Sequence, residues 1–299
     1  MKRVVITGSN GLLGQSLVSL LLNEKDKYKV IGFSRGDNRS GRNDFEYVSI
    51  DITDEMLLKE KLKTYTPDVI INTAAMTNVD ACEDNKEECD KLNVDVVHFL
   101  KEYAEKTNAH LIHLSTDFIF DGEKGYYKET DDPNPLSYYG MSKLKSEELL
   151  TSSSVHYTIL RTILVYGKVF DMSRSNIVLW VKKSLEEGKE VTIVNDQYRM
   201  PTYVEPLALA CKLVIDKKAK GVFNVSSKKL LSIYEIAMEI AEVFDLNKKL
   251  IKPISTQSLN QKASRPAKTG FDLSKSIEQL NFVPENFKQD LQNFKEKLT

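Results

Sequence analysis

A tyrosine and a lysine four residues apart are the pair of side chains with the most chemical content. Tyr139 and Lys143 share one face if their segment is helical, because residues four apart lie one above the other on a helix. A neighbouring ammonium group and an oxidised nicotinamide both favour the phenolate form of a tyrosine, so Tyr139 can act as a general acid or base at a substrate oxygen. The pair alone is a weak signal, since the chain has 13 tyrosines and many lysines.

A second polar group precedes this pair. Thr116 and Asp117 follow the apolar run 110–114, which predicts a buried strand. Doubly wound sheets bind their ligands at the carboxyl ends of parallel strands. We therefore expect Thr116 to give a second hydrogen bond to the substrate oxygen, and the catalytic candidates are Thr116, Tyr139 and Lys143.

A glycine loop near the amino terminus predicts where a phosphate group binds. It follows the apolar run 4–7, opens a helical pattern and has glycine at every third position. Free N–H groups and the positive end of the helix dipole favour a pyrophosphate there, and glycine allows close approach of the backbone. A simple tight turn is the alternative, but the position between a strand and a helix favours dinucleotide binding. The expected contacts are Gly8, Ser9, Asn10, Gly11, Leu12, Leu13 and Gly14.

The end of the second apolar run indicates which dinucleotide binds. An arginine there accommodates the 2′-phosphate of NADP, whereas a carboxylate binds the ribose hydroxyl of NAD. The chain has Ser34 and Arg35 at this point, which favours NADPH, while the nearby Asp37 keeps NADH as an alternative. The other expected cofactor contacts are Asp51, Ile52, Ala74, Ala75, Tyr139 and Lys143.

Short β-branched runs alternate with helical patterns over the first half of the chain. Strands are expected over 4–7, 30–33, 48–51, 68–72, 110–115 and 157–161. These runs are apolar on both faces, which predicts an α/β protein with a Rossmann-type, doubly wound parallel sheet. We assign residues 1–165 to an NADP(H)-binding Rossmann domain. Residues 166–299 are assigned mainly to a smaller α+β substrate domain, with some segments that return to the Rossmann sheet.

Helical patterns fill the intervals between the strands and continue after them. A long helix that ends near Lys106 is expected between the runs 68–72 and 110–115. Further helices are expected over 135–150, 173–187, 204–216 and 232–244, and the Lys/Glu-rich carboxyl terminus is expected to be a solvated helix. The single tryptophan, Trp180, lies in one of these patterns and is assigned to the core or to an interface.

The composition excludes several classes of partner. With 42 basic and 43 acidic side chains the formal net charge is −1, so no overall field attracts nucleic acid or an anionic membrane. The chain shows neither a signal-peptide pattern nor an apolar run that could span a bilayer, so we expect a cytoplasmic protein. The oligomeric state stays open, with a homodimer among the options.

No metal site is predicted within the chain. Cys82, Cys89 and Cys211 have no zinc-like spacing and are expected to be free thiols. His110 and His113 lie three residues apart on an expected strand and so face opposite sides, which favours structural roles. Use of a divalent metal at a dimer interface stays open.

Several motifs together resemble the extended short-chain dehydrogenases/reductases. They are the glycine loop and the segments 72–75, 115–122, 139–143 and 160–162. Further segments make nearly the whole chain similar to the dTDP-4-dehydrorhamnose reductase family within that superfamily: 135–140, 196–202, Arg265-Pro266 and Asp272-Leu273. The resemblance implies that NADPH reduces the 4-keto group of a nucleotide-linked 6-deoxysugar. The first expectation is conversion of dTDP-4-dehydro-L-rhamnose to dTDP-L-rhamnose.

The resemblance also implies roles for individual residues. Thr116 and Tyr139 hold the keto oxygen, Tyr139 gives its proton to the developing alkoxide, and Lys143 binds the ribose of the nicotinamide. Substrate contacts are expected from Thr77, Val79, Asp117 and Arg265, with Asp80 beside them. A core position for Val79 and a surface position for Arg265 are the alternatives.

One segment differs from the family pattern. A small residue and a tryptophan that packs against the sugar usually follow the Leu-Arg-Thr motif, whereas this chain has Ile163 and Leu164. The sugar and its nucleotide base therefore stay open. Another nucleotide-sugar reductase or epimerase is one alternative, and Phe118, in place of an acidic residue, disfavours a dehydratase. A non-catalytic regulatory subunit, like the methionine adenosyltransferase β subunit that resembles this family, is the other.

Overall fold

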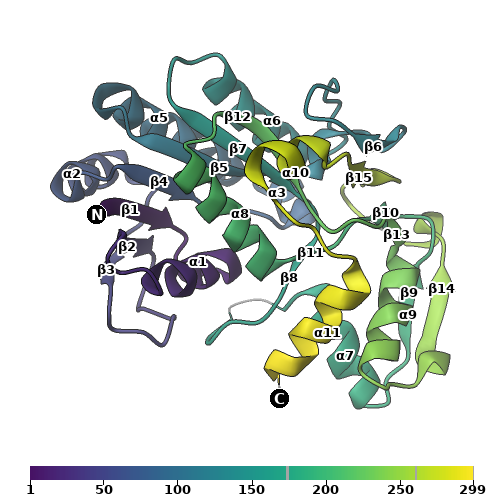
Figure 1. The fold of residues 1–299 in the computed structure, drawn as a ribbon. Coiled ribbons are helices and arrows are strands. Elements are labelled where there is room, and N and C mark those ends of the chain that lie inside the picture. Colours follow the sequence, from purple (N-terminus) through teal and green to yellow (C-terminus); the bar gives the residue numbers. More distant parts are fainter. Residues whose placement is uncertain (173–174, 260, 299) are drawn as a thin grey trace.

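A seven-stranded parallel sheet forms the centre of the protein (Figure 1). A computed structural model describes residues 1–172, 175–259 and 261–298. In spatial order the strands are β12 (Gly221–Val225), β7 (Tyr157–Thr162), β5 (His110–Thr116), β4 (Val69–Asn72), β1 (Lys2–Thr7), β2 (Tyr28–Ser34) and β3 (Glu46–Ser49). The order reverses between β1 and β4, which is where such sheets bind ligands. The predicted doubly wound α/β architecture is confirmed.

The strands are apolar on both faces because helices cover both faces. Val4 and Ile6 of β1 belong to one core cluster, and Val5 between them belongs to another, as the alternation of side chains in a strand requires. The first cluster lies under α1 (Leu12–Leu22) and α8 (Val204–Lys217). The second includes side chains of α2 (Glu55–Tyr65), α5 (Val96–Thr107) and α6 (Tyr138–Thr151).

Two segments near the sheet differ from the helices expected there. The chain between β4 and β5 is divided into α3 (Val79–Asp84), α4 (Lys86–Asp90), a π-helical turn (Lys91–Asp95) and α5. Helix α6 begins at Tyr138 and not at residue 135, because the Ser137 side chain accepts a hydrogen bond from the N–H of Gly140 and caps the helix. This cap places Tyr139 in the first turn.

A C-terminal lobe packs beside the sheet (Figure 1). Its core lies among α7 (Ile177–Glu186), α9 (Ile233–Val243) and α11 (Phe287–Leu298), with β9 (Val191–Val194) paired to β14 (Ile251–Ile254). Three short pairs join the remaining segments: β8 (Val165–Tyr166) with β11 (Thr202–Tyr203), β10 (Tyr198–Arg199) with β13 (Leu231–Ser232), and β6 (Gly125–Tyr127) with β15 (Thr269–Phe271). Helix α10 (Ser274–Leu280) and α8 lie against the Rossmann layer, where β12 extends the main sheet.

The structure changes two expectations about helices of the lobe. Trp180 of α7 is 44% exposed, so of its two expected places the core is excluded and an interface stays a prediction. Helix α11 is not solvated all round, because Phe287, Leu291 and Phe294 recur at helical spacing and are buried in the core of the lobe. Of the helix expected over 173–187, residues 173–174 lie outside the described residues.

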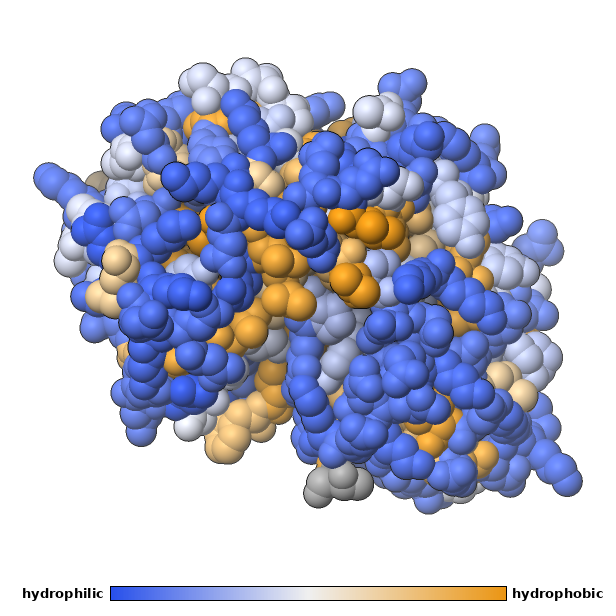
Figure 2. Space-filling model, viewed as in Figure 1, coloured by the Kyte–Doolittle hydropathy of each residue, from blue (hydrophilic) through white to orange (hydrophobic). Residues whose placement is uncertain are grey.

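The surface is hydrophilic over most of the face seen in Figure 2. Hydrophobic side chains gather near its centre, over α8 and the chain that leads from α10 to α11. Across the described ranges, no helix combines the length and the apolar character needed to cross a membrane.

Candidate active site

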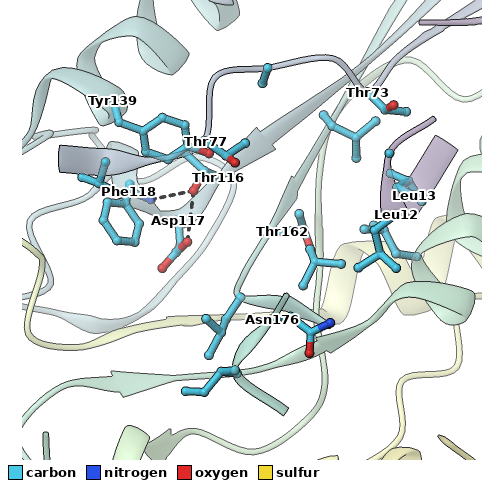
Figure 3. Close-up of a pocket in the computed structure, with 18 of the residues that line it drawn as sticks. Leu12, Leu13, Thr73, Thr77, Thr116, Asp117, Phe118, Tyr139, Thr162 and Asn176 are labelled. Carbon is cyan, nitrogen blue, oxygen red and sulfur yellow. Dashed lines mark hydrogen bonds between the residues drawn. The ribbon is translucent and has the colours of Figure 1, made fainter. Parts of the chain in front are cut away.

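A cavity of about 650 Å³ lies at the carboxyl ends of β1, β4 and β5, next to the C-terminal lobe. The expected site residues that line it are Asn10, Gly11, Leu12, Leu13, Ala75, Thr77, Val79, Thr116, Asp117, Tyr139, Lys143 and Arg265. Figure 3 shows Tyr139, Thr77 and Thr116 together on one side, with Leu12 and Leu13 across the cavity. One cavity therefore holds part of the glycine loop, the catalytic candidates and the substrate candidates.

The other expected cofactor residues lie away from the wall of this cavity. They are Gly8, Ser9, Gly14, Ser34, Arg35, Asp51, Ile52 and Ala74. The side chain of Ile52 is buried in the core between the sheet and α2, and Ala74 packs against the same core. Ser34 ends β2, and Asp51 lies two residues beyond the end of β3.

The glycine loop has the geometry that a pyrophosphate requires. Gly8 has a φ of +68°, and a Cβ on Gly14 would lie 2.2 Å from the carbonyl oxygen of Gly8. Gly14 therefore allows α1 to sit directly on the loop. Helix α1 begins at Leu12 and has no acidic residue in its first turn, so its N–H groups and dipole suit an anion. These residues fit a dinucleotide.

Asn10 connects the glycine loop to the arginine-containing segment after β2. Its Nδ2 donates to the carbonyl oxygen of Asp37 at 2.9 Å, and its Oδ1 accepts from the N–H of Arg39 at 2.9 Å. The Arg35 side chain is 76% exposed and lies 3.8 Å from Asp51. Arg39, which was not expected in the site, makes a two-point ion pair with Asp171. Two guanidinium groups therefore stand beside the loop.

Tyr139 and Thr116 meet because α6 packs tightly on the chain that follows β5. A Cβ on Gly140 would lie 2.2 Å from the carbonyl oxygen of Phe118, so glycine is needed for this approach. The Tyr139 hydroxyl lies beside the Thr116 side chain, which acts to lower its pKa (Figure 3). Thr116 Oγ1 also donates to Asp117 at 3.1 Å and accepts from the N–H of Phe118 at 3.2 Å (Figure 3).

Burial dominates the electrostatics of the two helical candidates. It raises the pKa of Tyr139 above its ordinary value, against the opposite effect of the Thr116 side chain. The expected downward shift depends on Lys143 together with an oxidised nicotinamide, and within the chain itself burial has the larger effect. Burial also lowers the pKa of Lys143 to about 8. Tyr139 is therefore held as a phenol that can give up a proton.

Lys143 reaches a residue that was assigned a structural role. Its Nζ lies 3.0 Å from Nε2 of His113, which is fully buried in β5. His110 faces the other side of the sheet layer, where its Nε2 lies 2.8 Å from Thr158 Oγ1. The odd spacing correctly separates the two histidines, but only His110 is remote from the cavity.

Asp117 is held by partners from the C-terminal half. Its Oδ2 lies 3.5 Å from Nε of Arg199, and it accepts a hydrogen bond from Thr269. Burial raises the pKa of Asp117, and the charge of Arg199 and these hydrogen bonds oppose that rise. Arg199 and Gln197 also line the cavity, although neither was singled out from the sequence. Their position in the segment 196–202, which carried the family resemblance, is the signal that could have indicated them.

Arg265 is anchored at the cavity rim. Its Nη2 donates to Asp80 Oδ2 at 2.7 Å, and the N–H of Ala263 donates to Asp80 Oδ1 at 3.0 Å. The hydrogen bond with Arg265 is the main reason that the pKa of Asp80 is lowered. Asp80 therefore orients a cation toward the cavity, where Thr77 and Val79 also lie.

The wall opposite this rim is apolar. Leu164, Val165, Ile177 and Ile233 contribute to it. Leu164 has a φ of +42°, which is strained for a leucine and must be held by its surroundings. The N–H of Thr202 donates to the carbonyl oxygen of Ile163 at 3.1 Å and supports this turn. Leu164 thus occupies part of the cavity wall at the position where the family resemblance implied a tryptophan.

Two of the three cysteines lie next to the site, because Cys82 and Cys89 share a buried cluster with Tyr139. Cys82, Cys89 and Cys211 are free thiols, as expected, and all three are buried. In the ranges that the structure describes, no three His, Cys, Asp or Glu side chains are grouped so that they could hold a metal ion.

The whole chain matches one protein family. The model described as "RmlD substrate binding domain" covers residues 1–299. The chain belongs to this family. It is 31% identical over 307 residues to a dTDP-4-dehydrorhamnose reductase of Aggregatibacter actinomycetemcomitans, with 99% of both chains covered. It is also 31% identical over 279 residues to methionine adenosyltransferase 2 subunit beta of Bos taurus, which covers 92% of this chain and 81% of that protein.

A solved structure supports the same assignment. The dTDP-4-dehydrorhamnose reductase of Bacillus anthracis, in complex with NADP, superimposes with a TM-score of 0.87 at 26% identity, with 99% of each chain covered. The resemblance that the motifs indicated is thereby confirmed at the level of the RmlD family and its extended dehydrogenase/reductase fold.

Proposed function

We propose that this RmlD-family protein uses NADPH to reduce the 4-keto group of a nucleotide-linked 6-deoxysugar. Its proposed substrate is dTDP-4-dehydro-L-rhamnose, which becomes dTDP-L-rhamnose. The observation that carries the proposal is the contact between Tyr139 and Thr116 inside a cavity that also reaches the glycine loop. A carbonyl oxygen held by both hydroxyl groups would lie beside the position of the nicotinamide.

The side chains divide the proposed reaction between them. Tyr139 and Thr116 bind the keto oxygen, and the protonated hydroxyl of Tyr139 gives its proton to that oxygen as negative charge develops there. Lys143, which is 1% exposed, stabilises the remaining phenolate. NADPH, when bound by the glycine loop, supplies the hydride.

Cationic side chains lie where the diphosphate of the substrate and the ribose phosphate of the cofactor would bind. Arg265, oriented by Asp80, offers a cation for a diphosphate, and Thr77 and Val79 lie next to it. Arg35 and Arg39 stand near the ribose end of the cofactor site and favour the 2′-phosphate of NADPH over a free hydroxyl. The engaged carboxylate of Asp117 disfavours a dehydratase, which would need a free acid beside the threonine.

The decisive experiment is a reduction assay. Purified protein, NADPH and a panel of dTDP- and UDP-linked 4-keto-6-deoxysugars are mixed, and loss of reduced-nicotinamide absorbance is followed. We expect turnover with at least one sugar, the dTDP-linked one first. Correct folding and NADPH binding without turnover on any sugar would contradict the proposal.

A regulatory subunit is the second candidate function. It is favoured by the 31% identity to methionine adenosyltransferase 2 subunit beta. The retained Thr116, Tyr139 and Lys143 support catalysis instead, because a regulatory protein has no need of this arrangement. Failure of the reduction assay, together with co-purification of a stable partner enzyme, would move the assignment to this class.

A further inference from the structure

His113 contacts Lys143 inside the protein, and the proposed reaction does not yet use it. Nζ of Lys143 lies 3.0 Å from Nε2 of His113, and both residues are at most 1% exposed. Among the described residues His113 is the hydrogen-bond partner of this ammonium group. Two basic groups in contact without water need a defined proton arrangement, since a lysine ammonium can only donate.

Both ring nitrogens of His113 are engaged. Nδ1 lies 3.1 Å from Nδ2 of Asn72, and Nε2 lies 3.0 Å from Oγ of Ser146. Oδ1 of Asn72 accepts a hydrogen bond of 2.6 Å from Thr7 Oγ1. All these residues are buried, so the chain Thr7–Asn72–His113–Lys143 runs through the sheet without solvent. Burial, and then the charge of Lys143, hold the pKa of His113 well below its ordinary value, so the ring is neutral.

The Asn72 amide decides which nitrogen of the neutral ring carries the proton. An amide NH2 can only donate, so when Nδ2 faces Nδ1 the ring proton is on Nε2, and that N–H faces Lys143 and Ser146. Ser146 can accept it, because its own hydroxyl donates to the carbonyl oxygen of Lys143 at 2.7 Å. A lysine that faces an N–H group is more stable as the neutral amine, because the amine can accept a hydrogen bond and the ammonium cannot. A half-turn of the amide places the proton on Nδ1 and leaves Nε2 as an acceptor for the ammonium.

We propose that His113 is a positioning residue for Lys143 and that Asn72 selects its tautomer. The tautomer then sets whether the ring accepts from the Lys143 ammonium or donates to the neutral amine. The catalytic consequence rests on the proposed function, in which the charged lysine stabilises the phenolate of Tyr139. His113 touches neither the substrate nor the reacting atoms, and acts only through Lys143.

The other groups that face Lys143 do not offer such a choice. Glu147 of the same helix favours the ammonium, but its carboxylate is paired with Arg161 of β7 at 2.7 Å. The thiol of Cys89 from α4 acts in the same direction, and the Tyr139 phenol lies one helical turn away. His113 is the one of these described groups in hydrogen-bond contact with Nζ, and its ring can exchange a donor for an acceptor there without a change of its own charge.

Nuclear magnetic resonance can observe the tautomer directly and without substrate. The chain has four histidines, so the ring signals in 15N-histidine-labelled protein can be assigned by removing one of them with His113→Phe. We expect one ring that stays neutral from pH 5 to 9, with its proton on Nε2. In Asn72→Asp the carboxylate can only accept, so this proton should move to Nδ1.

The titration of Lys143 should follow the tautomer. Its 13Cε signal, assigned with Lys143→Met, should titrate about one pH unit higher in Asn72→Asp and about one pH unit lower in His113→Phe than in the wild type. His110→Phe is the matched control, because it removes a second buried imidazole from the same strand and should leave the Lys143 titration unchanged. Thermal unfolding of each variant checks that it is folded.

The pH dependence of turnover is the catalytic readout. In Asn72→Asp the fall of kcat at alkaline pH should move upward together with the Lys143 titration, while KM for NADPH stays the same. The proposal would be overturned if folded Asn72→Asp keeps the ring proton of His113 on Nε2 and keeps the wild-type titration of Lys143, even if the protein reduces the sugar. Opposite shifts of Lys143 in the two variants would support it, even if no sugar in the panel is reduced.

Discussion

A buried ion pair lies at the edge of the main sheet where its parallel strands end, whereas one buried carboxylate of the C-terminal lobe has no ion-pair partner among the described residues. At the edge, Arg161 of β7 and Glu147 of α6 form a salt bridge of 2.7 Å, with side chains 6% and 3% exposed. In the lobe, Asp290 of α11 is 3% exposed, and burial raises its pKa to about 7. The neighbouring Tyr166 hydroxyl has no hydrogen-bond partner among the described residues.

The difference shows what each region is built for. A buried ion pair adds little net stability compared with apolar residues, because both charges lose their hydration. The pairs at the edge nevertheless surround the candidate site, where Asp117 bonds to Thr116 and Glu147 faces Lys143. We infer that they fix side-chain positions. A lone buried carboxylate fixes nothing and only reduces stability at neutral pH.

Removal of one hydroxyl at the edge should have the largest effect. In Tyr139→Phe we expect kcat to fall by about 10²–10⁴-fold, because the proton donor is lost. The affinity for NADPH, measured by fluorescence titration, should stay within about twofold. Unchanged turnover would remove Tyr139 from its proposed role.

Breaking the pair at the edge should have the next largest effect. Arg161→Met leaves Glu147 buried and uncompensated, so the free energy of unfolding in urea should fall by about 3–5 kcal/mol. The double variant Arg161→Met with Glu147→Leu should recover most of this loss, because no isolated charge is left. Equal losses in the single and the double variant would show that the packing of Arg161, and not its charge, matters.

The sequence was sufficient for those parts of the site that are local in the chain. The glycine loop, the end of β5 and the pair on α6 each lie within one short segment, and regular geometry determines how such a segment is presented. The contact between Lys143 and His113, and the pair between Asp117 and Arg199, join residues that are 30 and 82 positions apart. Only tertiary packing brings them together.

Other differences from the expectations have physical causes of the same kind. Burial moves the pKa of Tyr139 upward, and the expected downward shift needs the charge of a nicotinamide as well as that of Lys143. Helix α11 is rich in Lys and Glu, but its apolar residues at helical spacing are sufficient to bury one face. Trp180 is exposed because the buried face of α7 is formed by Val178, Val181 and Leu185.

Removal of the unpaired Asp290 carboxylate should increase the free energy of unfolding, whereas Arg161→Met should decrease it. The pKa of Asp290 rises from 3.8 to about 7 on folding, so wild-type stability is fully present below pH 4 and is lost as the pH rises to about 7. Asp290→Asn should therefore be more stable than the wild type by about 3–4 kcal/mol at pH 8, with the difference vanishing toward pH 4. Urea unfolding at several pH values measures this. Asp132→Asn, which changes an exposed carboxylate, is the control and should leave the pH dependence of the free energy of unfolding unchanged.

Breaking the exposed pair of Arg35 and Asp51 should have the smallest effect on stability, so this change tests cofactor binding alone. Arg35 and Asp51 are 3.8 Å apart with side chains 76% and 48% exposed, and such pairs contribute about 0–1 kcal/mol. Arg35→Ala should therefore unfold like the wild type but bind NADPH about tenfold more weakly, with NADH affinity unchanged, because only NADPH carries the 2′-phosphate. Arg42→Ala, which removes an arginine paired with Asp44, is the matched control. Equal weakening for both dinucleotides would mean that Arg35 contacts a part that they share, and NADPH selectivity would then rest on Arg39.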